Sequence, residues 1–191
     1  YHERGAIMKE ILDITKEKMG KCVNALESEL ATIRAGRANP SVLDRITVDY
    51  YGCPTPVNQM ASISVSEARI LVVQPFDAST LKSIEKAIQA SDLGINPTND
   101  GRVLRIAFPQ LTEDRRKELC KQVSKICEES KVAVRNVRRD ALDKLKAKKK
   151  NSEITEDDLK EAEKNVQKIT DKYIETIDAV GADKDKEIMS I

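Results

Sequence analysis

The chain has 191 residues, enough for one domain or two small ones, and its net charge is only +1. Aromatic residues make up 3% and charged residues 34%, a mixture that favours long helices. No run of 18 or more apolar residues exists and no secretory leader is visible, so we expect a cytoplasmic protein without a membrane partner.

The first predicted element is a helix over residues 11–33. Its apolar residues recur at helical spacing, no proline interrupts it, and Gly36 follows as a C-terminal capping signal. The preceding residues 1–7, YHERGAI, resemble an expression remnant ahead of a natural start at Met8. We therefore leave residues 1–7 out of the predicted fold.

Residues 36–110 have a different pattern and contain all six prolines. Alternating apolar and polar residues predict a strand that enters a turn at Gly52–Cys53–Pro54, and an Asn-Asp-Gly turn between two later strands. Residues 77–94 predict one helix, begun by Asp77 or Ser79 and ended at Gly94. Short strands are expected within residues 44–52, 61–65, 69–75 and 95–109.

Helical spacing returns after Pro109 and predicts two long helices. Thr112 is the expected N-cap of the first, which reaches about Lys149, and Thr155 is the expected N-cap of the second. Their apolar stripes consist of Leu119, Val123, Ile126, Val134, Val137, Ala141 and Leu145, and of Leu159, Ala162, Val166, Ile169, Tyr173, Ile177 and Val180.

Three amphipathic helices can bury their stripes against one another in a three-helix bundle. The predicted fold is therefore α+β with two domains. The first is a long bundle of residues 1–35 and 111–191, in which residues 1–7 are the expected remnant, and the second is a small α/β domain, residues 36–110, inserted between bundle helices. The two chain crossings, near Gly36 and Pro109, could form either a hinge or a rigid joint.

No catalytic constellation is present in the sequence. The only histidine, His2, lies in the presumed remnant, so acid–base or nucleophile chemistry with histidine is not expected. The cysteines show no metal-ligand spacing and read as reduced thiols, with burial favoured over metal ligation at Cys120 and Cys127. No phosphate-binding loop occurs. We expect no enzyme activity, no cofactor and no metal.

Positive charge is concentrated in residues 131–150, which hold nine basic and two acidic residues, whereas residues 151–191 hold six basic and twelve acidic ones. On a helical projection with Val134 at the origin, Lys131, Arg135, Arg138 and Arg139 lie about 40° to 140° around the helix. They form a basic strip with Arg138 nearest the core edge, and Asp140 points elsewhere.

Two interpretations of this strip are open. A charge run is commonly a solvated face paired with an acidic neighbouring helix. Against that, the strip has only one acid, Asp143, among the helical neighbours of Arg135 and Arg139, and arginine suits bidentate phosphate contacts. With few aromatic residues for base stacking, recognition of the backbone and shape of folded RNA fits better.

Five long motifs resemble the ribosome recycling factor family and occur in this order: ATIRAGRANPSVLD, YYGCPTPVNQMASI, EKAIQASDLGINPTNDG, PQLTEDRRKEL and KVAVRNVRRDALD. The resemblance runs from about Met8 to the C-terminus. It implies a three-helix bundle with an inserted α/β domain, joined by two hinges into an L shape that mimics tRNA. The hinge residues are expected at Ala35, Gly36, Pro109, Gln110 and Leu111.

The resemblance also implies a non-catalytic factor that splits the ribosome after termination, together with elongation factor G and GTP. Its bundle would dock on large-subunit rRNA through Arg34, Arg37, Lys131, Arg135, Arg138 and Arg139, and we expect a monomer. The alternative, from the residues alone, is a helical adaptor that binds a protein partner through its acidic last helix. Steep salt dependence of binding would favour RNA docking.

Overall fold

The computed structural model describes residues 2–33 and 38–190. These residues form two compact units. The first, here called the bundle, runs up to Ile33 and resumes from Glu113 to Ser190, and the second, the insert, lies between them and reaches Thr112. The bundle is helical and the insert contains antiparallel sheets, so the predicted α+β fold is confirmed.

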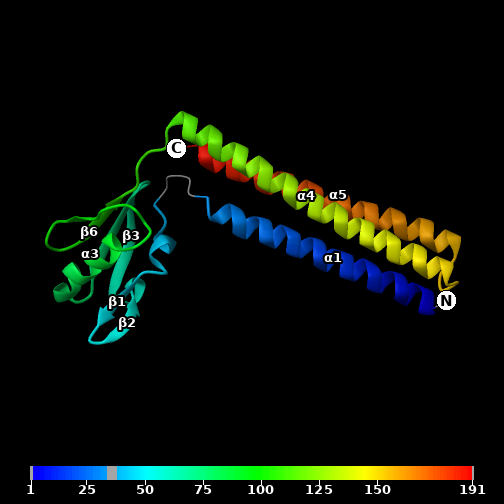
Figure 1. Cartoon of the computed structure of the whole chain (residues 1–191), viewed down its shortest axis with the longest axis horizontal. Coiled ribbons are helices and arrows are strands. Elements are labelled where there is room, and N and C mark those ends of the chain that lie inside the picture. The colour runs from blue at the N-terminus through cyan, green and yellow to red at the C-terminus, as the bar shows by residue number, and fades with distance from the viewer. Residues whose placement is uncertain (1, 34–37, 191) are drawn as a thin grey trace. The chain divides into compact units, whose positions relative to one another are not determined.

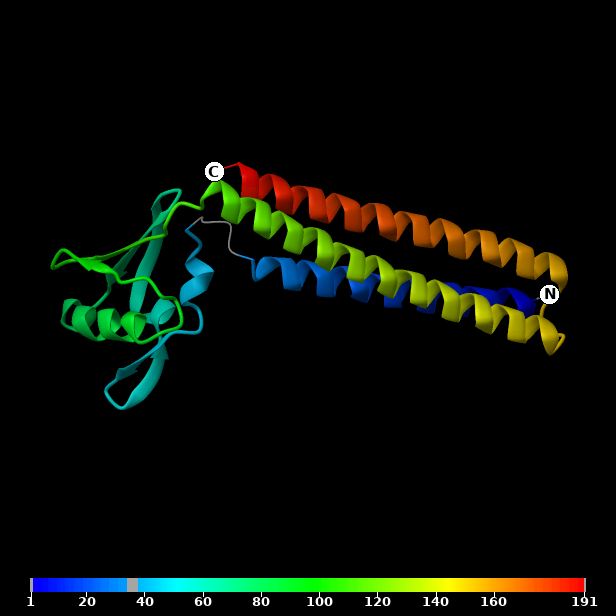
Figure 2. The same cartoon turned by 45° about the horizontal axis from the view of Figure 1, so that its top comes forward.

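The bundle consists of α1 (His2–Ala31), α4 (Glu113–Lys150) and α5 (Glu156–Met189). Each of these helices packs against the other two along its length, and α4 runs antiparallel to α1 and α5 (Figures 1 and 2). Thr155 begins α5 with a capping box: its hydroxyl accepts from the Asp158 amide, and the Asp158 carboxylate accepts from the Thr155 amide. The predicted N-cap at Thr155 is therefore confirmed.

The first helix begins earlier than the apolar spacing indicated. Residues 2–7, left out of the sequence-based fold, are helical and belong to α1. Arg4 Nη1 lies 3.4 Å from Asp158 Oδ2, and Ile7 packs against the buried cluster at this end of the bundle. At its other end α1 stops at Ala31, two residues before the expected end, and Gly36 lies outside the described residues.

Several residues of the expected stripes are only half-buried, and smaller neighbours take the buried positions instead. On α5, Thr170 and Gly181 are buried rather than Ile169 and Val180, because small side chains allow closely packed helices to approach. The Thr170 hydroxyl donates to the Val166 carbonyl at 2.8 Å, so its polarity is satisfied within the helix. On α4 the same exchange gives burial to Cys127 and Ser130 while the predicted Ile126 and Val137 remain partly exposed.

The insert contains a two-stranded sheet of β1 (Thr47–Tyr50) and β2 (Cys53–Pro56), and a four-stranded antiparallel sheet ordered β3-β4-β6-β5. The second sheet comprises β3 (Ala61–Glu67), β4 (Ile70–Pro75), β6 (Leu104–Ala107) and β5 (Thr98–Asn99). Short helical turns flank these strands: η1 (Pro40–Leu43), α2 (Val57–Met60) and η2 (Ala78–Thr80). Leu71 and Val73 of β4 share one buried cluster with Leu104 of β6 and Ile84 of α3 (Leu81–Gln89).

Two local predictions in the insert were wrong. The first turn is at Tyr51–Gly52, whose φ angles of 51° and 80° suit a tight hairpin, and Cys53 and Pro54 already belong to β2. The helix expected over residues 77–94 starts with η2, capped by the Asp77 side chain, and α3 ends at Gln89. Gly94 has a φ of 70° but follows a separate turn. The Asn-Asp-Gly turn before β6 is confirmed, with Gly101 at a φ of 91°.

Candidate nucleic-acid interface

The basic strip of Lys131, Arg135, Arg138 and Arg139 lies on the second half of α4. Arg135 and Arg139 are exposed, whereas Lys131 and Arg138 are half-buried. This difference in exposure agrees with the helical projection, because Lys131 and Arg138 lie closest to the core edge, where α5 packs. Arg34 and Arg37, the other expected rRNA contacts, lie outside the described residues.

Lys131 is paired with acidic residues. Its Nζ lies 2.5 Å from Asp178 Oδ1 on α5 and 3.4 Å from Glu128 Oε1 on its own helix. The hydrogen bond to Asp178 is the main cause that raises the Lys131 pKa. Lys131 therefore fits the interpretation of the strip as a solvated face, in which a basic side chain pairs with the acidic last helix.

Arg138 also contacts α5, but through a neutral group. Its Nη1 donates to Gln167 Oε1 at 2.9 Å, while its Nε is buried without a hydrogen-bond partner among the described residues. Gln167 Nε2 in turn donates to Asp171 Oδ1 at 2.7 Å. Arg138 is thus held in place while its formal charge is not matched by a directly bonded carboxylate.

Arg135 and Arg139 have no ion pair or side-chain hydrogen bond with any residue in the described part of the chain. By contrast, two lysines near the end of α4 are paired with the segment that follows the helix. Lys148 Nζ lies 3.5 Å from Glu153 Oε2, and Lys149 forms an ion pair with Glu156. Within the strip, the positive charge that is unpaired among the described residues is therefore that of Arg135 and Arg139.

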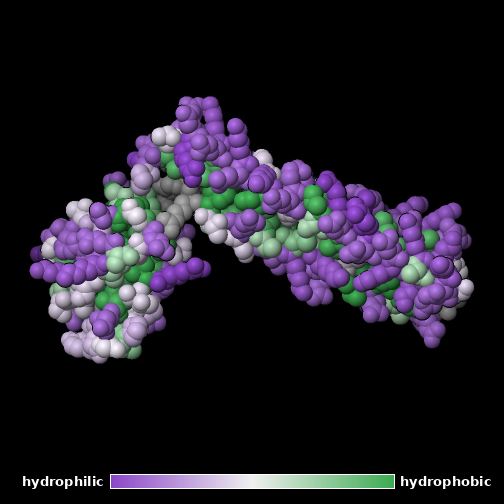
Figure 3. All heavy atoms as spheres, in the orientation of Figure 1, coloured by the Kyte–Doolittle hydropathy of each residue, from purple (hydrophilic) through white to green (hydrophobic). Residues whose placement is uncertain are grey.

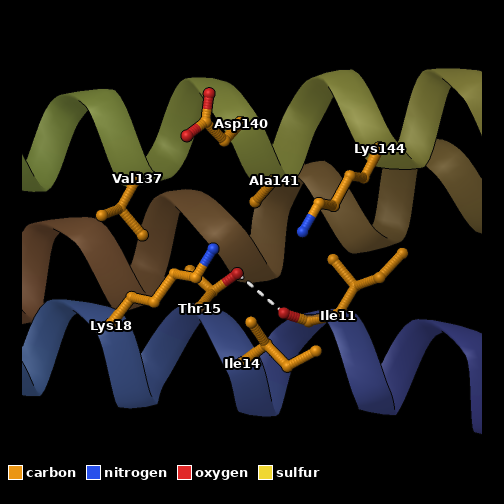
Figure 4. A pocket seen from close by; sticks show the side chains of 8 residues that line it. All are labelled: Ile11, Ile14, Thr15, Lys18, Val137, Asp140, Ala141 and Lys144. Carbon is orange, nitrogen blue, oxygen red and sulfur yellow. Dashed lines mark hydrogen bonds between the residues drawn. The ribbon is translucent and has the colours of Figure 1, made fainter.

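A small hollow lies between α4 and α1, on the side of α4 opposite the basic strip (Figure 4). Its volume is about 20 Å³, room for roughly one water molecule. Asp140 and Lys144 line it from α4, and Lys18 lines it from α1. This placement puts Asp140 away from the basic strip, as the helical projection predicted.

The expected hinge residues are described only on one of the two connections. Ala35 and Gly36 lie outside the described residues. On the other connection, the Phe108 amide donates to the Arg69 carbonyl at 2.8 Å, and no helix or strand is assigned from there to Thr112. Pro109, Gln110 and Leu111 lie in this irregular segment, where Gln110 accepts a 3.5 Å hydrogen bond from Arg69 Nη1.

The cysteines of the bundle are in packed surroundings that do not favour a reactive thiol. Burial raises the thiol pKa of Cys22, Cys120 and Cys127, which disfavours the reactive thiolate. Among residues 2–33 and 38–190, no group of three or more histidine, cysteine or acidic side chains is arranged to hold a metal ion.

Sequence reasoning missed the residues of α5 that organise the strip: Gln167, Asp171 and Asp178. Gln167 and Asp171 are four residues apart, which places them on one helical face, but their partners on α4 depend on how the two helices pack. On the face drawn in Figure 3, hydrophilic side chains cover most of the bundle. Within the described ranges, no helix combines the length and the apolar character needed to cross a membrane.

Fold and surface together define an α+β protein in which a helical bundle presents a basic strip and carries an inserted domain. The sequence profile of the ribosome recycling factor family matches residues 26–189. Ribosome-recycling factors from Caldicellulosiruptor bescii and Bacillus subtilis are 61% and 59% identical to the chain over 184 and 183 residues. These alignments cover 96% of this chain and 100% and 99% of the respective relatives.

Solved structures agree with the sequence comparison. A solution structure of the ribosome recycling factor is 40% identical, with a TM-score of 0.73, over 96% of this chain and 98% of that one. A second structure, 47% identical with a TM-score of 0.60, covers 95% and 98%. It represents models for the T. thermophilus ribosome recycling factor and the E. coli elongation factor G bound to the E. coli post-termination complex. The chain belongs to the ribosome recycling factor family.

Proposed function

We propose that this protein recycles ribosomes by binding the post-termination ribosome and, with elongation factor G and GTP, splitting it into subunits. It acts through binding and mechanical work, without catalysis of its own, as a monomer and at the site of ribosomes, which in bacteria is the cytoplasm. Support comes from its family and from the related factor whose structure includes elongation factor G and a post-termination complex.

The observation that carries the docking proposal is the set of arginines in the middle of α4. Arg135 and Arg139 are exposed and unpaired among the described residues, and Arg138 is bonded to a neutral amide. Guanidinium groups arranged in this way suit phosphate oxygens, which accept paired hydrogen bonds from arginine. We propose that they dock on large-subunit rRNA, together with Lys131, Arg34 and Arg37.

The alternative of a protein adaptor that uses the acidic last helix is less well supported. Asp178 and Glu156 of α5 already form ion pairs with Lys131 and Lys149 of α4. An α5 that is partly neutralised within the bundle offers less negative charge to a partner. Steep weakening of ribosome binding as salt rises would separate RNA docking from this adaptor function.

The test is replacement of Arg138 by alanine, followed by co-sedimentation with ribosomes at several salt concentrations. A lost charge-assisted contact should cost about 1–3 kcal/mol of binding free energy. It should also lower the salt slope by about one. We expect Arg138→Ala to weaken binding more than Arg135→Ala or Arg139→Ala, because Arg138 is the one whose guanidinium is held in place.

A control keeps this result from reflecting net charge alone. Lys117→Ala removes one positive charge from the same helix about 30 Å away, at a residue that forms an exposed pair with Glu113. It should bind ribosomes as the parent does. If Arg138→Ala instead loses its helical circular dichroism while each folded molecule binds normally, Arg138 is structural and the docking surface lies elsewhere.

We further propose that the two connections between bundle and insert act as hinges, at Ala35 and Gly36 and at Pro109, Gln110 and Leu111. A hinge would let elongation factor G move the insert while the bundle stays docked. A short crosslink between cysteines introduced into the two connections should preserve ribosome binding and abolish splitting, measured by light scattering. The exposed Cys53 should first be replaced by serine, so that it does not compete for the crosslinker. Splitting at the normal rate by the crosslinked protein would exclude the hinge.

A further inference from the structure

Arg138, a residue of the basic strip, reaches a neutral acceptor on a neighbouring helix. Its Nη1 donates to Gln167 Oε1 at 2.9 Å, and Gln167 Nε2 donates to Asp171 Oδ1 at 2.7 Å. The three side chains therefore form a chain of hydrogen bonds from the surface of α5 to α4. We call Asp171, Gln167 and Arg138 the relay.

The direction of the relay follows from the chemistry of its ends. An ionised carboxylate only accepts hydrogen bonds, and a guanidinium only donates them. Gln167 lies between the two, so its amide must turn its NH₂ group to Asp171 and its carbonyl to Arg138. Asp171 therefore orients Gln167, and Gln167 orients the arginine.

A neutral link has a consequence that a direct ion pair would not have. Lys131, about two turns away on the same side of α4, is bonded to the carboxylates of Asp178 and Glu128, which offset its charge. Arg138 is oriented by an amide, and the nearest acid of the relay is one side chain further out. The arginine is thus pre-ordered while its charge remains free to meet a phosphate.

We propose that Gln167 and Asp171 are positioning residues for the docking arginine: they fix the orientation of Arg138 without neutralising it. This inference rests on the proposed function, in which Arg138 meets rRNA. It adds that α5, the acidic helix of the bundle, takes part in ribosome binding indirectly, by lowering the entropy that Arg138 loses on docking.

Asp171 gives the sharpest test, because simple electrostatics and positioning predict opposite signs. Removal of a negative charge near a basic strip should strengthen RNA binding if charge alone matters. Positioning predicts that Asp171→Ala weakens ribosome binding about two- to tenfold, the cost of ordering one long side chain on binding. The salt slope should stay unchanged, since the number of phosphate contacts is the same.

Asp171→Asn is the matched variant for this test. It removes the same charge but keeps a carbonyl oxygen that can accept from Gln167. It should therefore bind at least as tightly as the parent protein. Binding by Asp171→Ala that equals or exceeds that of the parent, or a loss as large in Asp171→Asn, would overturn the positioning role.

Gln167→Glu tests the need for a neutral link. A carboxylate bonded to Arg138 should offset its charge, weaken ribosome binding by about tenfold and lower the salt slope by about one. Gln122→Glu is the control, since it adds the same charge at an exposed position of α4 about 24 Å from Arg138. If Gln167→Glu binds like Gln122→Glu, the neutral link has no role.

Arg138→Ala, measured in parallel, separates the docking role of Arg138 from the positioning role of Gln167 and Asp171. Weaker binding by Arg138→Ala with unchanged binding by the Gln167 and Asp171 variants would leave the docking surface standing and overturn the relay alone. Unchanged binding by Arg138→Ala would overturn both. Circular dichroism and the thermal midpoint of each variant show whether a loss of binding comes from unfolding.

Discussion

The bundle and the insert are held together in different ways. The insert buries one cluster of hydrophobic side chains drawn from strands, turns and α3, with Leu71, Val73, Ile84 and Leu104 fully enclosed. The bundle buries narrow seams in which small and polar residues such as Thr170 and Gly181 alternate with aliphatic ones.

This difference has a physical reason. A helix satisfies its own backbone hydrogen bonds, so a bundle can place a threonine in its seam and return the hydroxyl to a carbonyl of the same helix, as Thr15 does to Ile11 at 2.7 Å. A small sheet has fewer such options, because its cohesion comes from non-local apolar contacts. The stability of the bundle should therefore depend on the size of its seam residues. The stability of the insert should depend on each large side chain in its buried cluster.

The largest expected effect comes from truncation of the two cores. Leu104→Ala in the insert and Leu145→Ala in the bundle each remove a fully buried side chain and should each cost about 2–5 kcal/mol of unfolding free energy. If the units unfold separately, Leu104→Ala should accelerate hydrogen exchange in the insert and spare α1, α4 and α5, and Leu145→Ala should do the reverse. Equal loss of protection throughout the chain in both variants would show one cooperative unit.

A smaller effect is expected at Gly181, where α5 approaches α4 closely. A Cβ atom added at Gly181 would lie 2.8 Å from Cys127 Sγ, which is closer than real contacts allow. Gly181→Ala should therefore destabilise the bundle by about 1–3 kcal/mol, although alanine favours a helix. Thermal or urea unfolding measures this change.

Two companion variants sharpen the Gly181 prediction. Cys127→Ala in the Gly181→Ala background removes the clashing sulfur and should recover part of the lost stability. Gly20→Ala on α1 is the control, since its Cβ would meet only the Tyr173 hydroxyl, at an ordinary 3.8 Å. It should stabilise the bundle by up to about 1 kcal/mol through helix propensity. Destabilisation by Gly20→Ala equal to that by Gly181→Ala would contradict the close-approach explanation.

The smallest expected effect is a pH dependence, to which Asp100 contributes in the insert and Asp158 in the bundle. In the insert, the amide of Val103 is the main cause that lowers the Asp100 pKa to about 2. In the bundle, the backbone hydrogen bond from Thr155 lowers the Asp158 pKa. A depressed folded-state pKa contributes stability above the unfolded value near 3.8 that is lost as pH falls through the folded value.

We therefore expect each unit to lose stability as pH falls below about 4. Asp100→Asn should reduce this loss in the insert between about pH 4 and pH 2 and leave the bundle unchanged. Asp158→Asn should reduce it in the bundle only. Hydrogen exchange or urea unfolding across that range measures both. A pH profile of the insert that is the same with and without Asp100 would exclude this source.

The sequence by itself determined the class of fold and its order of elements. The signals were local: helical spacing over three segments, a proline-rich middle segment and the cap at Thr155. Each signal lies within, or a few residues from, the element that it specifies. The motif resemblance led to the family, which the comparisons confirm. Boundaries such as the start of α1 at His2 and the turn at Tyr51–Gly52 were missed, because packing and backbone twist decide them.

Only the tertiary structure decided which members of the basic strip are paired. A helical projection placed Lys131 and Arg138 near the core edge, but it contains no information about the residues of α5 that face them. Packing of α5 on α4 brings Asp178 to Lys131 and Gln167 to Arg138, across 47 and 29 residues of sequence respectively. The sequence shows that each of these residues is basic. Its partner depends on the register between α4 and α5, which are joined in the chain only by a turn.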